Sequence, residues 1–194
     1  LETLARLNVE LRARDLGITL VFFIITARGT RSLDPHALRA HGILNELSEV
    51  SARIGRDVGE RLFRRSAAGQ LPDLDELVDE YWRVRHRRVA HGLRTQRLPP
   101  ISTHVIEDAE NDPILMHARH LGLTNAQSDP VKLVYHPEFI NPVSPLWAMD
   151  YEQFVRGCHL GIFPSSYEPW GYTPLECVAM GVPTVTSDLA GFGR

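Results

Sequence analysis

Short apolar segments alternate with helical segments through the second half of this sequence. Strands are expected at residues 101–106, 131–135, 160–163 and 182–186, and helices at 113–121, 150–158 and 174–180. Alternation at this spacing favours a parallel sheet with helices on both faces. Sheets of this kind bind ligands beyond the carboxyl ends of their strands. The loops after Tyr135, Phe163 and Thr186 are therefore the expected places for functional residues.

The start of the chain shows the same two patterns. Residues 2–16 have the periodicity of an amphipathic helix, which Gly17 is expected to end. Residues 18–25 then form a continuous apolar run rich in β-branched and aromatic side chains. Such a run suits a strand that is buried on both faces.

Residues 34–97 differ from the sequence on either side, because they carry many charges and place apolar residues at helical spacing. They predict two long helices, the second capped by Asp73 or Asp75. The expected fold is therefore α/β, a Rossmann-like parallel sheet with a two-helix insertion. Residues 1–33 and 98–194 would form the sheet domain.

Composition adds mainly exclusions. The 194 residues fit one domain with an insertion, and 43% hydrophobic and 23% charged residues are ordinary for a soluble protein. A net charge of -3 does not favour nucleic acid or an acidic membrane as partner. Cys158 and Cys177 stand in apolar surroundings, where free thiols of a reducing compartment are expected.

The chain also shows no sign of export. Its longest apolar run, residues 18–27, is far shorter than the ~20 residues of a membrane helix. A cytoplasmic location is the simplest expectation. Leu1 opens inside a helical pattern and Arg194 follows a Gly-Phe-Gly turn, so we expect the chain to be part of a longer protein.

The loop before the last expected helix carries the most chemistry. It holds Glu168, then Gly171, where the backbone can approach a ligand. Thr173 suits the N-cap and Pro174 the first helical turn. A helix N-terminus at the mouth of a parallel sheet is suited to binding phosphate, because its free N–H groups and dipole point at the ligand.

Two interpretations of the glutamates are open from the pattern. Thr173 and Glu176 match a capping box, in which Glu176 bonds back to the backbone at the helix start. Glu176 would instead be free to bind a ligand if that box does not form. Glu168 precedes a proline, so it lies in extended backbone, among aromatic residues where an unpaired carboxylate is costly.

The two glutamates, separated by seven residues, resemble the Glu-x7-Glu motif of retaining glycosyltransferases with two facing Rossmann-like domains (the GT-B type). More narrowly, residues 129–139, 151–177 and 187–193 resemble the glycogen synthases of animals and fungi. Weaker similarity extends over essentially the whole chain. The resemblance implies that this chain is the donor-binding part of such an enzyme.

The resemblance also implies site residues. Phe139 and Tyr151 would flank the donor uracil, although a core aromatic is the alternative for each. Glu176 would accept hydrogen bonds from the ribose. His159 also matches the family pattern and is a candidate for substrate binding, with a buried structural histidine as the alternative.

The remaining implied residues follow the last strand but one. Glu168, together with the Trp170 and Gly171 backbone, would hold the donor glucose. Tyr172 and Thr173 would face the phosphates. The two glutamates of the motif are the candidate catalytic residues, and no metal or cofactor is expected.

The activity implied is transfer of glucose from UDP-glucose to the non-reducing end of an α-1,4-glucan such as glycogen, with retention of configuration. Two alternatives stay open: a retaining enzyme that uses ADP-glucose, and a non-catalytic oligomerisation or glucan-binding module. In the family, the cations that bind the diphosphate precede the part that this chain resembles. A homo-oligomer is implied through helices at 34–97, with Leu77, Tyr81 and Trp82 as expected contact residues.

Three other patterns favour structural roles. Asp73 and Asp75 match the Asp-x-Asp of metal-dependent transferases but stand at an expected helix start, where carboxylates are favourable. His117 and His120 lack a third metal ligand nearby. The basic run at 83–88 follows an acidic stretch, which indicates a salt-bridged or subunit-contacting helix.

Overall fold

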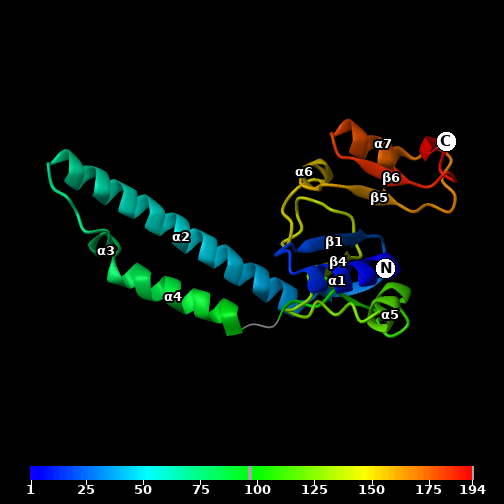
Figure 1. Ribbon diagram of the computed structural model, residues 1–194, viewed down its shortest axis with the longest axis horizontal. Helices are drawn as coiled ribbons and strands as arrows, with labels where there is room; N and C mark the ends of the chain where they lie inside the picture. Colours follow the sequence, from blue (N-terminus) through cyan, green and yellow to red (C-terminus); the bar gives the residue numbers. More distant parts are fainter. Residues whose placement is uncertain (96–97, 194) are drawn as a thin grey trace. The chain divides into compact units, whose positions relative to one another are not determined.

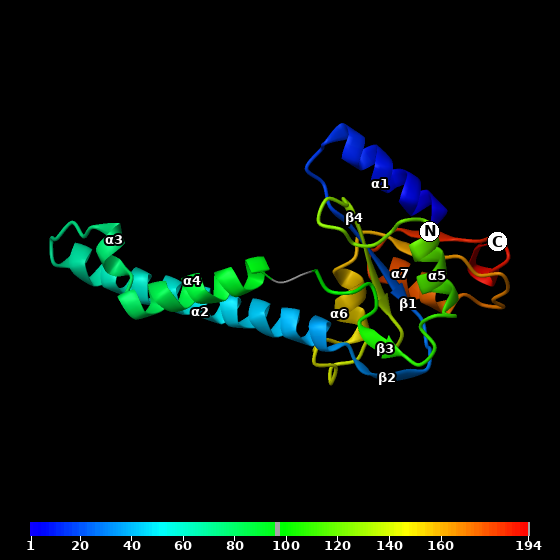
Figure 2. The same ribbon diagram turned by 90° about the horizontal axis from the view of Figure 1, so that it is seen from below.

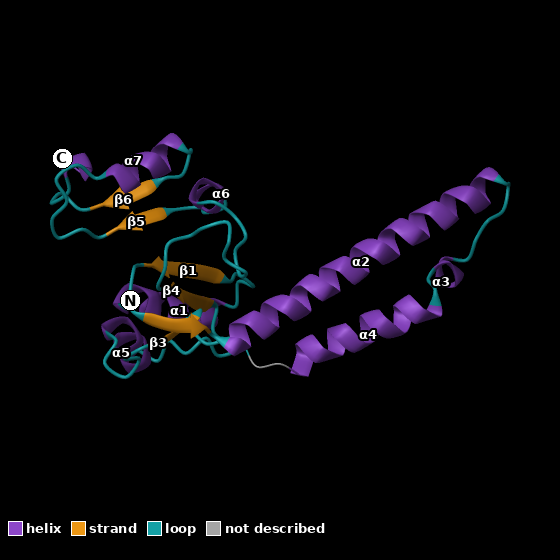
Figure 3. Ribbon diagram, turned by 180° about the vertical axis from the view of Figure 1, so that it is seen from behind, coloured by secondary structure: helices purple, strands orange, loops and turns teal. Residues whose placement is uncertain are grey.

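The structure is a computed structural model that describes residues 1–95 and 98–193. The helices are α1 (Glu2–Arg14), α2 (Pro35–Ala67), α3 (Leu74–Leu77), α4 (Glu80–Thr95), α5 (Pro113–His120), α6 (Tyr151–Arg156) and α7 (Tyr172–Ala179), as Figure 1 labels them. The strands are β1 (Leu20–Ile25), β2 (Thr30–Leu33), β3 (His104–Ile106), β4 (Val131–His136), β5 (Gly161–Phe163) and β6 (Thr184–Thr186), and a 3-10 turn, η1, spans Gly191–Gly193 (Figure 3). The chain divides into two compact units, Leu1–Pro137 and Glu138–Arg194.

The centre of the first unit is a parallel strand pair. β1 and β4 run side by side in register from Leu20 opposite Val131 to Ile25 opposite His136. Buried Leu133 of β4 belongs to a core cluster against which Leu4 of α1 packs. The parallel pairing confirms the α/β expectation, but β1 is not buried on both faces as predicted. Among the described strands it pairs with β4 alone, and none of its side chains is fully buried.

The strand expected at residues 101–106 is shorter and pairs differently from the prediction. β3 lies antiparallel to β2, a strand that the sequence did not predict because Thr30–Leu33 has no apolar alternation. Only an isolated bridge between Ser102 and Tyr135 keeps the expected parallel direction. The described strands therefore form three two-stranded sheets rather than one continuous parallel sheet.

The stretch predicted to be helical forms α2, α3 and α4. α2 begins after Asp34, whose side chain accepts hydrogen bonds from the backbone of His36 and Ala37. The second predicted helix is interrupted, because Val78 is extended between α3 and α4. Asp73, and not Asp75, caps α3. The predicted end of this insertion, residues 96–97, lies outside the described residues.

α2 packs along α4, and the two views in Figures 1 and 2 show them side by side. Ion pairs join the long helix to the segments that pack on it, including Arg85 of α4 to Glu46 at 3.1 Å and Glu76 of α3 to Arg65 at 3.6 Å. These pairs are exposed and contribute about 0–1 kcal/mol each. They confirm that the basic run of α4 belongs to a salt-bridged helix.

The second unit contains a β5–α7–β6 motif. β5 and β6 pair in parallel, from Gly161 opposite Thr184 to Phe163 opposite Thr186. The connecting helix α7 buries Cys177 in a small core with Val155 and Val182. This arrangement is the parallel βαβ unit that the alternation of patterns predicted. Within the described residues, no helix has the length and apolar character needed to cross a bilayer.

Candidate functional site

All the site residues predicted from the sequence lie in the second unit. They come from the segment before α6, from the first residue of α6, from the turn between α6 and β5, from the loop after β5, and from the first turns of α7. The β5 loop follows the carboxyl end of a parallel strand, which is where ligands bind in sheets of this kind.

Helix α7 begins earlier than the sequence predicted. Gly171 is its N-cap, with φ of 75° in the left-handed region, and Tyr172 is the first helical residue. Glycine adopts this conformation without the steric cost that other residues pay. Thr173 is therefore inside the helix, and no side chain caps α7.

The capping-box interpretation of Glu176 is consequently wrong. A capping box needs Thr173 at the N-cap and Glu176 three residues later, but Thr173 occupies the second helical position. The Glu176 side chain is exposed on α7. Its expected role toward a ribose stays a prediction.

Glu168 is held at both its side chain and its backbone. The half-buried carboxylate accepts a hydrogen bond from the Ser165 hydroxyl, with 3.0 Å between Oγ and Oε2. The backbone forms a parallel bridge with Ala190, and its carbonyl accepts from the Gly191 N–H at 2.8 Å. The prediction of extended backbone at Glu168 is thus confirmed, and the carboxylate among the aromatics has a hydrogen-bond partner.

The turn η1 packs against this loop so closely that two glycines are required. A Cβ on Gly191 would lie 2.0 Å from the Pro169 carbonyl oxygen, and one on Gly171 would lie 2.8 Å from Cβ of Phe192. Contacts this short do not occur between real atoms of this kind. Gly191 and Phe192 were not predicted to belong to the site, although the Gly-Phe-Gly pattern was a signal for close backbone approach.

Several of the predicted aromatic residues are exposed. Phe139, Trp170 and Tyr172 are 78%, 72% and 63% exposed. The core-aromatic alternative for Phe139 is therefore wrong. Large exposed aromatic side chains offer flat faces on which a base or a sugar ring can stack.

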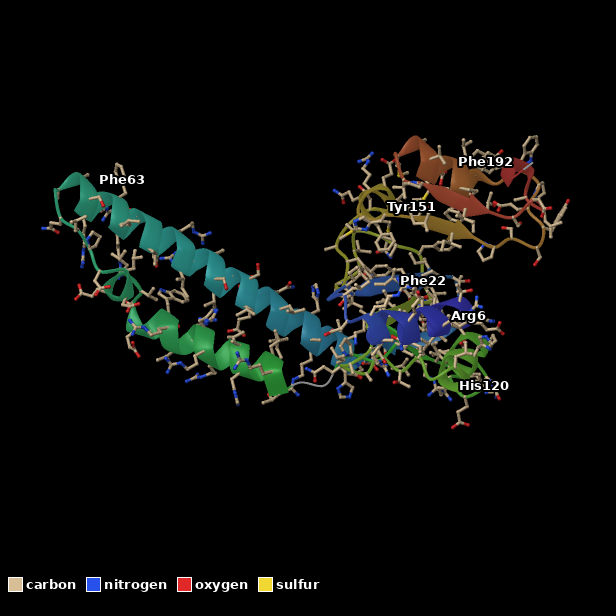
Figure 4. All side chains as sticks on the ribbon, in the orientation of Figure 1. Arg6, Phe22, Phe63, His120, Tyr151 and Phe192 are labelled. Atoms are coloured by element: carbon tan, nitrogen blue, oxygen red, sulfur yellow. The ribbon has the colours of Figure 1, made fainter. Side chains whose placement is uncertain are left out.

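Tyr151 differs, because it is half-buried at the start of α6 (Figure 4). Its ring packs against the cluster formed by Val155, Cys177 and Val182. Burial raises the pKa of Tyr151, and the nearby Cys177 and Glu176 add to the rise.

The remaining predicted residues show which alternatives hold. His159 is exposed between α6 and β5, so a buried structural histidine is excluded. Cys158 and Cys177 are free thiols, as expected, and burial raises the pKa of both. In the part of the chain that the structure describes, no three His, Cys, Asp or Glu side chains are grouped so that they could hold a metal.

The second unit therefore belongs to the Rossmann-like α/β class, with polar and aromatic residues beyond the carboxyl end of a parallel strand. A family model described as glycogen synthase matches residues 1–194 of this chain. The chain belongs to the glycogen synthase family, which confirms the resemblance to the animal and fungal enzymes.

The curated relatives come from animals and yeast. The chain is 43% identical over 193 residues to the liver glycogen [starch] synthase of Homo sapiens. It is 44% identical over 197 residues to the glycogen [starch] synthase of Caenorhabditis elegans, and 44% identical over 203 residues to isoform 1 of Saccharomyces cerevisiae. Each alignment covers 100% of this chain but only 28–29% of the relative.

Proposed function

We propose that the protein containing this chain transfers glucose from UDP-glucose to the non-reducing end of an α-1,4-glucan, with retention of configuration. The chain would supply the donor-binding part. The observation that carries the proposal is the fixed Glu168 carboxylate, which lies three residues before the N-cap of α7, so that a sugar-binding acid and a phosphate-binding helix start adjoin.

The start of α7 supports phosphate binding. The first N–H groups of a helix have no partner within the helix. Pro174 has no N–H, and the Leu175 N–H already donates to the Gly171 carbonyl at 3.4 Å. The N–H groups of Tyr172 and Thr173 are therefore the first-turn donors for a diphosphate, in agreement with the roles that the family resemblance implies.

The nucleoside would be bound by the other predicted residues. Phe139 offers an exposed ring for the uracil, and Tyr151 offers a half-buried ring on α6. Glu176, which interacts electrostatically with Tyr151, would accept hydrogen bonds from the ribose hydroxyls. His159 is accessible to substrate as well.

The chemistry would depend on stabilising the departing diphosphate. The α7 dipole would favour its negative charge, together with cations outside these 194 residues. Glu168 would lie beside the sugar, where positive character develops at the reacting carbon. The acceptor hydroxyl would attack from the same face, so that configuration is retained, and neither metal nor cofactor is required.

The 194-residue chain alone should bind UDP weakly and transfer no glucose. It has the helix start and the aromatic faces but would lack the diphosphate cations and the acceptor domain. Each missing charge-assisted bond is worth about 1.5–3 kcal/mol, so affinity should fall more than tenfold per cation. Calorimetric titration with UDP, and with ADP as control, measures this. Absence of UDP binding at millimolar concentration would favour a non-catalytic module. Glucose transfer by the chain alone would contradict the proposal that cations and an acceptor domain outside these 194 residues are needed.

We also propose that the full protein is a cytoplasmic homo-oligomer whose contacts use α2 and α4. Leu44, Phe63 and Tyr81 are exposed apolar residues on these helices, and Figure 4 labels Phe63. The expectation for Leu77 was wrong, because its side chain is fully buried where α3 packs on α2. Exposed apolar patches on soluble proteins commonly mark interfaces.

Changing Leu44, Phe63 and Tyr81 together to serine should reduce the sedimentation coefficient of the full-length protein. These changes remove exposed apolar surface and leave the buried Val50, Leu77 and Val89 intact. Ser51→Asn, an exposed polar change on α2, is the matched control and should leave the mass unchanged. An unaltered oligomer in the triple variant would contradict this interface.

A further inference from the structure

The ends of β5 and β6 are joined by hydroxyl groups that come from none of the site residues predicted from the sequence. The Thr186 hydroxyl donates to the Phe163 carbonyl at 3.4 Å, and the Ser187 hydroxyl donates to the Ser165 carbonyl. The Ser165 N–H donates to the Phe163 carbonyl at 2.9 Å. The residues just after both strands are therefore fixed to one another.

This arrangement fixes the backbone of Ser165 at both of its polar groups. Its carbonyl accepts a hydrogen bond from the Ser187 hydroxyl, and its N–H donates to the Phe163 carbonyl. The Ser165 hydroxyl takes no part in these two backbone bonds and can bind another residue. A serine hydroxyl carries one proton. That proton is donated to Oε2 of Glu168, with 3.0 Å between the oxygens.

Glu168 is constrained from the opposite side as well. Its carbonyl accepts from the Gly191 N–H at 2.8 Å, in the segment that follows Ser187. The residues after β6 thus hold the backbone of Glu168 through Gly191 and its carboxylate through Ser187 and Ser165. Because the Ser165 hydroxyl takes one acceptor position of Oε2, Oε1 and the second lone pair of Oε2 can still accept from a ligand.

We infer that Ser165 is a positioning residue of the donor site, which fixes the orientation in which the Glu168 carboxylate receives the sugar. The inference rests on the proposed function of Glu168. Ser187 supports the same orientation one step further away, because its hydroxyl holds the Ser165 carbonyl. A site must be held within a fraction of an ångström to be effective, and hydrogen bonds to the reacting group supply such control.

The test uses the full-length enzyme with UDP-glucose and glycogen. Ser165→Ala should lower kcat about tenfold, the effect expected for a lost hydrogen bond to a charged group, with a much smaller change in KM. Ser165→Thr keeps a hydroxyl and should restore most of the activity. Ser166→Ala is the matched control, because this neighbouring serine is exposed, and it should behave as wild type.

A double-mutant cycle with Glu168→Ala separates positioning from a general loss of stability. When the carboxylate is absent, Ser165→Ala has nothing to orient and should cause no further loss of kcat. Ser187→Ala should show a smaller loss with the same dependence on Glu168, which keeps the test decisive if Ser165→Ala folds poorly. Thermal melts of every variant give the folded fraction.

The outcomes distinguish this inference from the proposed function. Wild-type kcat in Glu168→Ala would overturn the proposed function itself. An impaired Glu168→Ala together with a fully active Ser165→Ala would overturn the positioning role alone. The positioning role would also be overturned if the loss in Ser165→Ala multiplies in full with that of Glu168→Ala, because the two residues would then act independently.

Discussion

If the proposed function holds, Glu168→Gln in the full-length protein should lower kcat and kcat/KM together by ~100-fold or more. Glutamine keeps an oxygen that can accept the Ser165 hydroxyl bond, so the loop should stay folded. On the proposed function the substitution removes a negative charge beside the reacting carbon, worth about 3 kcal/mol if it favours the positive character of the transition state. Steady-state kinetics with varied UDP-glucose measure both constants.

Glu176→Gln is the matched comparison for this prediction. Glu176 is exposed and takes no part in a capping box, so the substitution should leave α7 intact. Its expected effect is weaker donor binding, seen mainly as a raised KM with kcat little changed. If both variants instead lower the melting temperature and keep normal activity per folded molecule, the two carboxylates are structural and not catalytic.

Gly191→Ala should have the second large effect, although Gly191 was not predicted to belong to the site. The added Cβ would lie 2.0 Å from the Pro169 carbonyl oxygen, so the η1 turn and the Glu168 loop must move apart. Overpacking of this kind costs about 1–3 kcal/mol. The displacement would also break the bond from the Gly191 N–H to Glu168, so kcat/KM should fall more than tenfold.

The control for Gly191→Ala is Gly42→Ala. A Cβ on Gly42 meets nothing within 4 Å, and the residue lies inside the long helix α2. Alanine should stabilise this helix by roughly 0.5–1 kcal/mol and leave activity unchanged. Thermal melts and steady-state kinetics on both variants measure these effects. A fully active Gly191→Ala would show that the η1 turn does not support the loop that carries Glu168.

The sequence predicted those parts of the fold that depend on local patterns. Helical spacing predicted a helix in the region that begins near residue 34 and another at 113–121, where the structure has α2 and α5; Asp34 and Asp112 each accept two backbone N–H bonds at these helix starts. The apolar run at 18–25 predicted β1. These patterns depend on residues close together in the sequence, so they can be recognised without knowing the distant contacts of the fold.

Features that depend on distant partners were missed. β2 has a polar sequence and exists because β3 pairs with it from about seventy residues further along the chain. The N-cap of α7 is Gly171 and not Thr173 as predicted; Gly171 adopts a positive φ, and Phe192 of η1 lies against it. The bonds from the Ser187 hydroxyl to Ser165 and from the Ser165 hydroxyl to Glu168 join residues after β5 and β6, which are adjacent because the two strands pair.

The candidate site shows the same division. The Glu-x7-Glu spacing and the family resemblance predicted Glu168, Glu176 and the aromatic residues as site residues without the structure. Exposure could not be predicted for single residues, so Phe139 and His159 each kept a structural alternative that the structure removes. Ser165 and Gly191 could not be predicted from the sequence, because only the structure shows their hydrogen bonds to Glu168.

If this chain binds UDP-glucose for transfer to a glucan, as we propose, glucose transfer by the full-length protein is the measurement that shows it. The full-length protein, incubated with labelled UDP-glucose and glycogen, should incorporate glucose without added metal. NMR of the product should show new α-1,4 linkages, which means that the α configuration of the donor is retained. Incorporation should fall ~100-fold in Glu168→Gln. Absence of transfer from UDP-glucose, transfer only from ADP-glucose, or a β-linked product would contradict the claim.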